Sequence, residues 1–310
     1  MRITTVIVVR ALVLESFSGP DAVAVRDVPE PEGGDGGVLL EVRAAATGPW
    51  DIATTYGAFA GGGGQTGFPQ VLGWDVAGVR ADTGQRVAGF VAQPWAGVGV
   101  FAERVALPES ALAPIPDGLE DEAAATLGVT ALTARLALDT AARPRGAHVL
   151  VVGAGGAVGS AVVALGVADG LVVSGSAGTA DGERTRAAGG TPLDRARDLG
   201  AQQREAGLPA PDAVFDFVGG DAGAAAMELL ADGGMFVSAT PNAVPSGVRG
   251  IEPTVISVHP DGAGLAGLLP RFATGELPVP RFETAPLEQG AEAFRRFASG
   301  GVVGKLVLVP

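Results

Sequence analysis

One segment, residues 148–160, constrains the fold of this chain more than any other; it reads HVLVVGAGGAVGS. An apolar, β-branched run enters a glycine-rich turn, and an Ala- and Val-rich helical segment follows directly. Glycines let backbone N–H groups approach phosphates, and a helix N-terminus carries about half a positive charge. The segment therefore predicts a dinucleotide site at a strand–turn–helix junction. The alternative is a plain glycine-rich turn, since 49 of the 310 residues are glycine.

The glycine spacing in this turn is Ala-x-Gly-x-x-Gly, with alanine where the usual pattern has its first glycine. The candidate cofactor contacts that the turn supplies are Gly153, Ala154, Gly155, Gly156, Ala157, Val158 and Gly159. Strand–helix alternation continues to about residue 239, which predicts a doubly wound parallel sheet, the Rossmann arrangement. Ligands bind beyond the carboxyl ends of such strands, so four residues are expected to line the nicotinamide and its ribose: Val218, Gly219, Ala239 and Thr240.

The regions on either side of this alternation differ from it. Residues 10–116 are β-rich, with short strands expected at 38–44 and 86–90, and residues 123–142 read as one helix. The tail predicts two more helices and a last strand, at 264–273, 287–299 and 306–309. The fold class expected is α/β, with a parallel Rossmann sheet and a second, β-rich part.

The charge balance bears on possible partners. Lys and Arg number 21 and Asp and Glu 34, a formal net charge of −13, and no basic run occurs. These features argue against nucleic acid or an anionic membrane as partner. The apolar opening segment, residues 1–9, is too short for a secretory signal, and no run reaches the ~18 apolar residues of a membrane span. A cytoplasmic location is expected.

The chain has no cysteine and only two histidines, His148 and His259. Disulfides, thiolate nucleophiles and cysteine-based zinc sites are excluded, and no tetrahedral zinc site can be built from these residues. We expect no metal ligands, and we interpret His148 as a structural residue of a core strand.

These residues and motifs resemble those of the medium-chain dehydrogenase/reductase superfamily, specifically its zinc-free quinone oxidoreductase (zeta-crystallin-like) branch. The pieces that carry the resemblance are 17–22, 38–46, 49–51, 72–78, 84–89, 101–108, 153–159, 215–220, 232–238, 260–262 and 304–308. The resemblance implies a GroES-like substrate domain formed by 1–121 and 245–310, with a Rossmann domain, 122–244, inserted in it and the active cleft at their junction. It also implies hydride transfer from NADPH to a quinone or an α,β-unsaturated carbonyl compound. A homodimer joined through the edge of the cofactor-domain sheet is expected as well.

The chain departs from this family at the expected active site. Zinc-dependent relatives have Cys and His ligands where this chain has Gly48 and Trp74, and many quinone reductases have Asn at the first of these positions. Asp51 matches the branch, whereas the single tyrosine, Tyr56, is slightly displaced. A carbonyl acceptor needs a hydrogen-bond donor and a proton. The candidates are the hydroxyl of Tyr56, the indole N–H groups of Trp50 and Trp74, or water, and we expect Tyr56 to be the proton donor. The alternative for Tyr56 is a tyrosine at the rim of the cleft, and the two tryptophans are expected to be apolar walls rather than donors.

The choice of cofactor depends on the end of the second Rossmann strand. An acid about 20 residues after the glycine turn would bind the 2′-hydroxyl of NAD, but Ser174 and Ser176 stand there. We therefore expect NADP(H), with NAD(H) as the alternative, and with these hydroxyls and Arg184 near the 2′-phosphate. The alternative for Arg184 is a solvated helix face. Thr130 lies where the branch has a threonine near the cofactor, although it could simply bond to its own helix backbone.

Three functions remain open from the sequence. The first is a reductase of quinones or enones, and the second is a biosynthetic tailoring enzyme that reduces one large enoyl substrate or closes a ring. The third is an NADPH-binding protein without catalysis. The sequence does not identify the substrate, the direction of reaction or the proton donor.

Overall fold

The computed structural model describes residues 7–31 and 37–310, so residues 1–6 of the apolar opening segment lie outside the described residues. The chain divides into two units. Unit 1 comprises Met1–Val129, His259–Thr274 and Val279–Pro310, and unit 2 comprises Thr130–Val258 and Gly275–Pro278. Unit 1 is thus discontinuous in sequence. The divisions lie after residues 129, 258, 274 and 278, whereas the family resemblance implies boundaries after 121 and 244.

Unit 2 contains a six-stranded sheet in the order β11-β10-β9-β12-β13-β14, and all its strand pairs are parallel. Its strands are β9 (His148–Val152), β10 (Val172–Ala177), β11 (Thr191–Asp194), β12 (Ala213–Asp216), β13 (Met235–Ser238) and β14 (Thr254–Val255). Counted along the chain this order is 3-2-1-4-5-6, the doubly wound arrangement that the sequence predicts.

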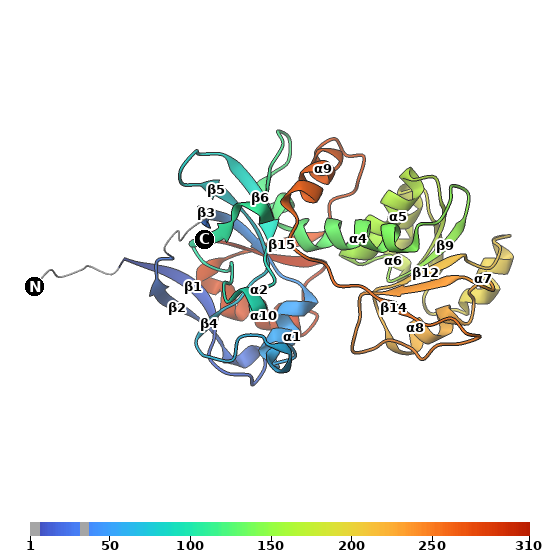
Figure 1. The fold of residues 1–310 in the computed structure, drawn as a ribbon, viewed down its shortest axis with the longest axis horizontal. Coiled ribbons are helices and arrows are strands. Elements are labelled where there is room, and N and C mark those ends of the chain that lie inside the picture. The colour runs from blue at the N-terminus through green and yellow to red at the C-terminus, as the bar shows by residue number, and fades with distance from the viewer. Residues whose placement is uncertain (1–6, 32–36) are drawn as a thin grey trace, which may run out of the picture. The chain divides into compact units, whose positions relative to one another are not determined.

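Helices cover both faces of this sheet, as Figure 1 shows for α5 and α8. The helices that follow or join its strands are α4 (Gly128–Ala141), α5 (Ala157–Ala168), α6 (Thr179–Ala187), α7 (Leu199–Glu205) and α8 (Gly220–Met227). A sheet covered on both faces needs strands that are apolar throughout. All five residues of β9 are buried, and Leu150 packs in one core cluster with Val214, Phe236 and Met227.

Unit 1 is β-rich and contains a sheet of seven strands and a sheet of three. The larger sheet has the order β15-β16-β3-β5-β6-β8, with β7 also paired to β3, and the smaller is β2-β1-β4. The strands are β1 (Val8–Leu14), β2 (Val23–Pro29), β3 (Gly37–Ala46), β4 (Gln70–Val71), β5 (Asp75–Arg80), β6 (Arg86–Phe90), β7 (Arg104–Pro108), β8 (Leu112–Pro114), β15 (Phe282–Pro286) and β16 (Lys305–Val309). The α-helices are α1 (Pro49–Thr55), α2 (Gln93–Ala96), α3 (Asp121–Ala125), α9 (Gly262–Ala273) and α10 (Gly290–Ala298), and the 3-10 helices are η1 (Pro20–Ala22), η2 (Ala60–Gly62), η3 (Glu109–Ala111) and η4 (Leu287–Gln289).

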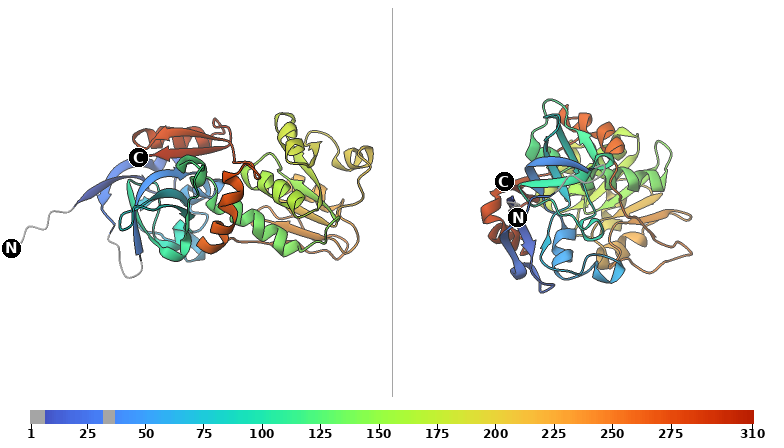
Figure 2. Two further views of the ribbon diagram at one scale, coloured as in Figure 1. Left: turned by 90° about the horizontal axis from the view of Figure 1, so that it is seen from above. Right: turned by 60° about the vertical axis from the view of Figure 1, so that its left-hand side comes forward.

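The end of the chain completes the larger sheet. β16 pairs antiparallel with β3 through Val307 with Ala46 and Leu308 with Ala45, and Figures 1 and 2 show these red C-terminal strands beside the blue ones. The residues from both ends of the sequence share one apolar core, in which Phe294 and Leu308 lie with residues of β1 and β3.

The helix predicted at 123–142 is in fact two helices, α3 and α4. Thr126 ends the first, because its hydroxyl donates to the carbonyl oxygen of Ala123 at 2.7 Å. The second begins at Gly128, where a Cβ would lie 2.6 Å from Oδ1 of Asp75. Glycine is needed at this position because the carboxylate and the helix start approach so closely.

In the described part of the chain, no helix combines the length and the apolarity that crossing a bilayer requires.

Candidate functional site

The glycine turn of unit 2 has the geometry that its sequence predicts. Gly153, directly after β9, has a φ of 88°, which favours glycine. A Cβ on Gly159 would lie only 2.2 Å from the carbonyl oxygen of Gly153, so helix and strand can approach this closely only at glycine. The N-cap of α5 is Gly156, which has no side chain to accept bonds from the first helical turn. The N–H groups at this helix start are thus available to an anion.

The turn is held by the neighbouring strand. The backbone N–H groups of Gly153 and Ala154 both donate to the carbonyl oxygen of Ser176, at 3.1 and 2.9 Å. Ala154 is buried, whereas Gly156 is exposed. The remaining residues of the turn, Gly155, Ala157 and Val158, are half-buried at the surface of the same junction.

The ends of β9, β12 and β13 bring several predicted residues together. A Cβ on Gly153 would lie 2.9 Å from Cγ2 of Val218, and one on Gly219 would lie 3.0 Å from Oγ1 of Thr240. Val218 is 54% exposed. Ala239 adjoins them as a half-buried residue directly after β13.

Asp216 holds this arrangement in place. Its buried Oδ1 accepts hydrogen bonds from the backbone N–H groups of Val218 and Gly219, at 3.0 and 2.8 Å. The hydroxyl oxygen of Ser238, at the end of β13, lies 2.7 Å from the hydroxyl oxygen of Thr240. A buried carboxylate that caps local N–H groups positions the strand-end turn rather than reacting.

The residues predicted near the 2′-phosphate are not all accessible. Ser174 is fully buried, and its hydroxyl lies 2.9 Å from Nε2 of His148, so Ser174 is not among the residues that we assign to the cofactor. Ser176 is 5% exposed at the end of β10. Arg184 is half-buried on α6 and already engaged, and its neighbour Arg186 pairs with Glu183 at 2.6 Å.

Two charged residues that the sequence reasoning missed lie at this end of the sheet. A Cβ on Gly155 would lie 2.6 Å from Oδ2 of Asp181, and one on Gly178 would lie 3.8 Å from Cζ of Arg195. Asp181 lies in the first turn of α6, beyond the usual spacing for a ribose-binding acid, and Arg195 follows β11. The position of this arginine could be predicted from the sequence only if the bounds of β11 were known.

Thr130, on α4, is fully buried, and its hydroxyl has no hydrogen-bond partner among the described residues. The expectation that it merely bonds to its own helix is therefore not met.

In unit 1, α1 carries two of the predicted catalytic residues, Trp50 and Asp51. Asp51 accepts from the N–H of Gly48 at 2.8 Å and so fixes the start of the helix. Trp50 lies over that glycine, since a Cβ on Gly48 would lie 2.2 Å from the indole ring. The indole thus occupies the space that a Cys or Asn side chain would need at position 48.

The second oxygen of Asp51, Oδ1, is buried and has no partner among the residues described. Burial raises the pKa of Asp51 well above its usual range; the Gly48 N–H opposes this rise and the charge of Asp75 adds to it. This carboxyl group therefore keeps its proton to a higher pH than an exposed aspartate does.

Lys305 and Asp75 form the charged neighbourhood of this helix. Nζ of Lys305 donates to Oδ2 of Asp75 at 2.8 Å and lies 5.2 Å from the centroid of the Trp50 ring. Burial raises the pKa of Asp75, and Lys305 acts against that rise. Lys305 thus forms a buried structural salt bridge with Asp75.

Aromatic rings gather beside these residues. Trp74 lies 5.9 Å from Trp50, 6.0 Å from Phe59 and 6.1 Å from Trp95, measured between ring centroids. The indole nitrogens of Trp50 and Trp74 are buried, and neither has a hydrogen-bond partner within the described ranges. Buried indole N–H groups usually have a partner, so these two are donors in need of an acceptor.

Gln93 is a further polar residue that the sequence reasoning missed. It is fully buried at the start of α2, and neither its amide nitrogen nor its oxygen has a partner in the described part of the chain. Gln93 lies close to Trp74 through the backbone, because Val91 donates to the carbonyl oxygen of Trp74 and Gln93 donates to that of Val91. A glutamine at the start of a four-residue helix matches no sequence motif, so its buried and unpartnered amide could not be predicted.

Tyr56 is not part of this aromatic group. It caps the C-terminus of α1, is 64% exposed, and lies against Gly19, where a Cβ would be 3.2 Å from its hydroxyl oxygen. The structure therefore brings together Trp50, Asp51 and Trp74 but leaves Tyr56 at the surface.

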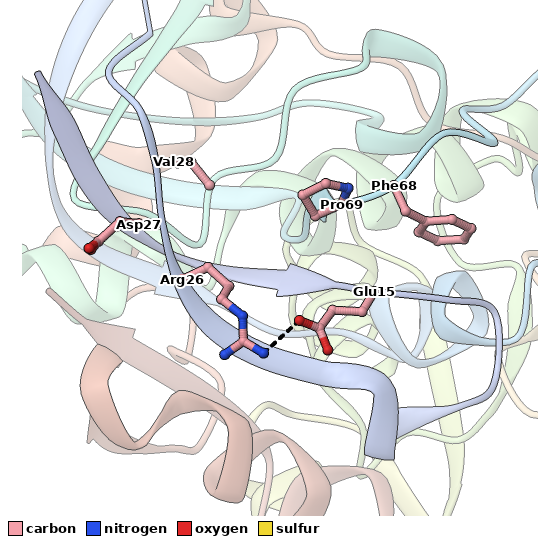
Figure 3. A pocket seen from close by; sticks show the side chains of 6 residues that line it. All are labelled: Glu15, Arg26, Asp27, Val28, Phe68 and Pro69. Carbon is pink, nitrogen blue, oxygen red and sulfur yellow. Dashed lines mark hydrogen bonds and ion pairs between the residues drawn. The ribbon is translucent and has the colours of Figure 1, made fainter. Parts of the chain in front are cut away.

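A separate hollow lies on the surface of unit 1, lined by Glu15, Arg26, Asp27, Val28, Phe68 and Pro69. In Figure 3 the guanidinium group of Arg26 points toward Glu15, with which it pairs at 2.6 Å. None of the predicted catalytic or cofactor residues lines this hollow.

Across residues 7–31 and 37–310, no three His, Cys, Asp or Glu side chains gather so that they could hold a metal ion.

Comparisons with known proteins show that the chain is similar to dehydrogenases and reductases. A family model described as zinc-binding dehydrogenase matches residues 191–308. The chain is 32% identical to the quinone oxidoreductase of Mus musculus over 184 residues, which are 56% of this chain and 54% of that enzyme. It is 28% identical to the 2-methylene-furan-3-one reductase of Solanum lycopersicum over 305 residues, 93% of this chain and 74% of that one.

The solved structures agree with the sequence relatives. A putative alcohol dehydrogenase from Sinorhizobium meliloti 1021 has a TM-score of 0.85 at 26% identity, covering 98% of this chain and 97% of its own. The matches to the first two curated relatives span only about half of those proteins, 44% and 54% of their lengths.

Proposed function

The chain belongs to the medium-chain dehydrogenase/reductase superfamily, and we propose that it is a zinc-independent oxidoreductase that transfers hydride from NADPH to a quinone or an α,β-unsaturated carbonyl compound. Zinc-independence rests on composition, since the chain has no cysteine and two histidines. The substrate class rests on the two relatives, one a quinone oxidoreductase and the other a 2-methylene-furan-3-one reductase.

The observation that carries the proposal for the cofactor is the gathering of residues at the carboxyl ends of β9, β12 and β13. Gly156, the N-cap of α5, leaves the first-turn N–H groups free of side-chain acceptors, and Gly153 and Gly159 let the helix start lie close to the strand. These residues fit a pyrophosphate, and we assign Val218 and Thr240 to the nicotinamide half. When bound, NADPH would supply the hydride.

The role of unit 1 in this proposal is to bind and polarise the acceptor. Negative charge develops on a carbonyl oxygen as the compound is reduced, and preorganised N–H donors in a dry site stabilise that charge strongly. The unpartnered indole N–H groups of Trp50 and Trp74 are the donors that we assign to this oxygen. The rings of Phe59 and Trp95 beside them suit a flat, apolar substrate.

We assign to Asp51 the donation of the proton that the substrate needs after it has accepted the hydride. Burial raises its pKa, and its Oδ1 is without a partner among the described residues, so it can hold a proton there. Tyr56 is less suited to this step than the sequence indicates, because its ring lies against Gly19 and is 64% exposed.

The experiment follows NADPH oxidation under anaerobic conditions, with 1,4-benzoquinone and 2-cyclohexenone as acceptors. Trp50→Phe and Trp74→Phe retain an aromatic ring and remove the N–H, so each should lower kcat by about 10-fold or more while the Kd for NADPH stays unchanged. Tyr56→Phe serves as the control and should have little effect. Loss of activity in Y56F but not in the tryptophan variants would refute the assignment of donors.

A specialised biosynthetic reductase remains the second candidate, favoured by Trp50 over Gly48, which changes the position where many relatives have Asn. NADPH binding without turnover of either acceptor would support it or the non-catalytic alternative, and would remove the general quinone reductase from consideration.

A further inference from the structure

The guanidinium group of Arg195 lies at the end of the second strand of the parallel sheet. The backbone N–H of Arg195 donates to the carbonyl oxygen of Ala177, the last residue of β10, at 2.9 Å. A Cβ on Gly178, the next residue, would lie 3.8 Å from Cζ and Nε of Arg195 and 3.9 Å from its Nη2. The positive group therefore lies directly beside the backbone at which β10 ends.

In a sheet of this strand order, the residue at this position determines whether NAD(H) or NADP(H) is preferred. An acid near the end of the second strand accepts bonds from the ribose 2′-hydroxyl, whereas an arginine accommodates a 2′-phosphate. Ala177 and Gly178 have no carboxylate, and Gly178 has no side chain to keep a phosphate away from the guanidinium group. A planar guanidinium group can bind a phosphate through two N–H groups at once.

Arg195 is also free to make such a contact. It is exposed, and no carboxylate pairs with it within residues 7–31 and 37–310. Its neighbours differ in this respect, because Arg186 pairs with Glu183 at 2.6 Å and Arg197 pairs with Glu205 at 3.0 Å.

Two acids lie near this end of the sheet. Asp194 precedes Arg195, and its Oδ1 accepts from the N–H of Ala196 at 2.9 Å, so its charge is partly satisfied. Asp181 lies over Gly155 of the glycine turn. Arg195 therefore adds positive charge at an end of the sheet that also holds these two carboxylates.

We propose that Arg195 is the specificity-determining residue for the cofactor and binds the 2′-phosphate of NADP(H). This inference rests on the proposed function. It replaces the expectation from the sequence, which assigned the role to Arg184 and the two serines of β10.

Isothermal titration calorimetry tests the assignment directly, with the intact protein and three ligands: NADPH, NADH and 2′,5′-ADP. The last carries the 2′-phosphate without the nicotinamide. Arg195→Gln should weaken binding of NADPH and of 2′,5′-ADP by about 10- to 100-fold and leave NADH unchanged. Arg186→Gln is the matched control, an exposed arginine on α6 already paired with Glu183, and should change none of the three affinities.

The outcomes separate the inference from the proposed function. If the unaltered protein prefers NADPH and R195Q loses both dinucleotides equally or neither, the role of Arg195 is refuted while the reductase proposal stands. A preference of the unaltered protein for NADH likewise refutes the role of Arg195. If the unaltered protein binds neither dinucleotide, both proposals fail.

Discussion

Lys305 and Asp75, which are 230 residues apart in the sequence, form an ion pair of 2.8 Å in which both side chains are buried. The pair joins β16 to β5, and the other carboxylate oxygen of Asp75 accepts from the N–H of Val129 at 2.7 Å. Removing one partner of a buried pair leaves an uncompensated charge, which is far more costly than losing a surface pair.

Lys305→Met should therefore lower the free energy of unfolding by about 3–5 kcal/mol, measured by urea denaturation at neutral pH. The double variant Lys305→Met with Asp75→Asn should recover most of this loss, because Asn can still accept from Val129 and carries no charge. The control is Arg186→Ala on the surface, which should cost less than about 0.5 kcal/mol. A double variant no more stable than the single one would show that charge burial is not the cause.

Asp51 gives a pH-dependent contribution to stability. Burial raises its pKa in the folded protein above the ordinary value of 3.8, so the folded state binds its proton more tightly than the unfolded state does. The contribution is fully present below pH 3.8 and is lost as the pH rises through the folded pKa. Asp51→Asn retains an oxygen for the N–H of Gly48 and cannot ionise. The free energy of unfolding of this variant should therefore rise relative to the unaltered protein as the pH increases, by up to about 1.4 kcal/mol per pH unit. A difference that does not change with pH would contradict this.

The contribution of His148 to stability depends on pH in the opposite direction. Its Nδ1 lies 2.8 Å from the carbonyl oxygen of Pro209, which can only accept, so the neutral ring carries its proton there and Nε2 accepts from Ser174. Burial lowers the pKa of His148 below the ordinary 6.5, which the carbonyl of Pro209 partly opposes. Stability present above pH 6.5 should therefore decline as the pH falls below that value toward the folded pKa.

His148→Gln should remove this part of the pH dependence, seen as a difference from the unaltered protein in urea denaturation between about pH 7.5 and about pH 5. His259→Gln, at an exposed position, is the control and should leave the dependence intact. An equal effect of both variants would mean that His148 is not the group responsible.

The cofactor turn could be predicted from the sequence because its geometry is local. A glycine after a strand and another six residues later produce the close approach of Gly159 to Gly153 almost independently of the rest of the chain. The parallel pairing of the strands followed from the alternation of elements for a related reason, since parallel strands need helical connections.

The parts that could not be predicted depend on distant segments. Ser174 lies at the expected spacing, but its hydroxyl is directed to His148 of the neighbouring strand, which the spacing does not indicate. Arg195 reaches Gly178 only because β11 pairs with β10, and no strand is predicted at 191–194 from the sequence. Tyr56 follows α1 directly, yet the end of that helix directs its ring toward Gly19.

Gly159 and Gly267 are a matched pair of helical glycines. A Cβ on Gly159 would lie 2.2 Å from a backbone oxygen, whereas one on Gly267 of α9 would have nothing within 4 Å. Gly159→Ala should reduce stability by about 2 kcal/mol or more and abolish measurable NADPH binding, because the turn must shift. Gly267→Ala should instead stabilise the protein by about 0.5–1 kcal/mol, since alanine favours the helix. Thermal unfolding and calorimetry with NADPH measure both effects, and tolerance of alanine at position 159 would refute the close-packing argument.

We propose that two copies of the chain associate through the edge strand β14. β14 ends the order of the six-stranded sheet, and Val255 on it is 47% exposed. The N–H of Ile256 donates to Ser238 of β13, so the N–H of Val255, one residue earlier, is directed to the opposite edge. Val255→Pro therefore keeps the pairing with β13 and removes a donor from the outer edge. In light scattering after size-exclusion chromatography, the unaltered protein and the control Val255→Thr should have twice the mass of one chain, and V255P the mass of one. A dimer that survives in V255P, with circular dichroism unchanged, would place the interface elsewhere.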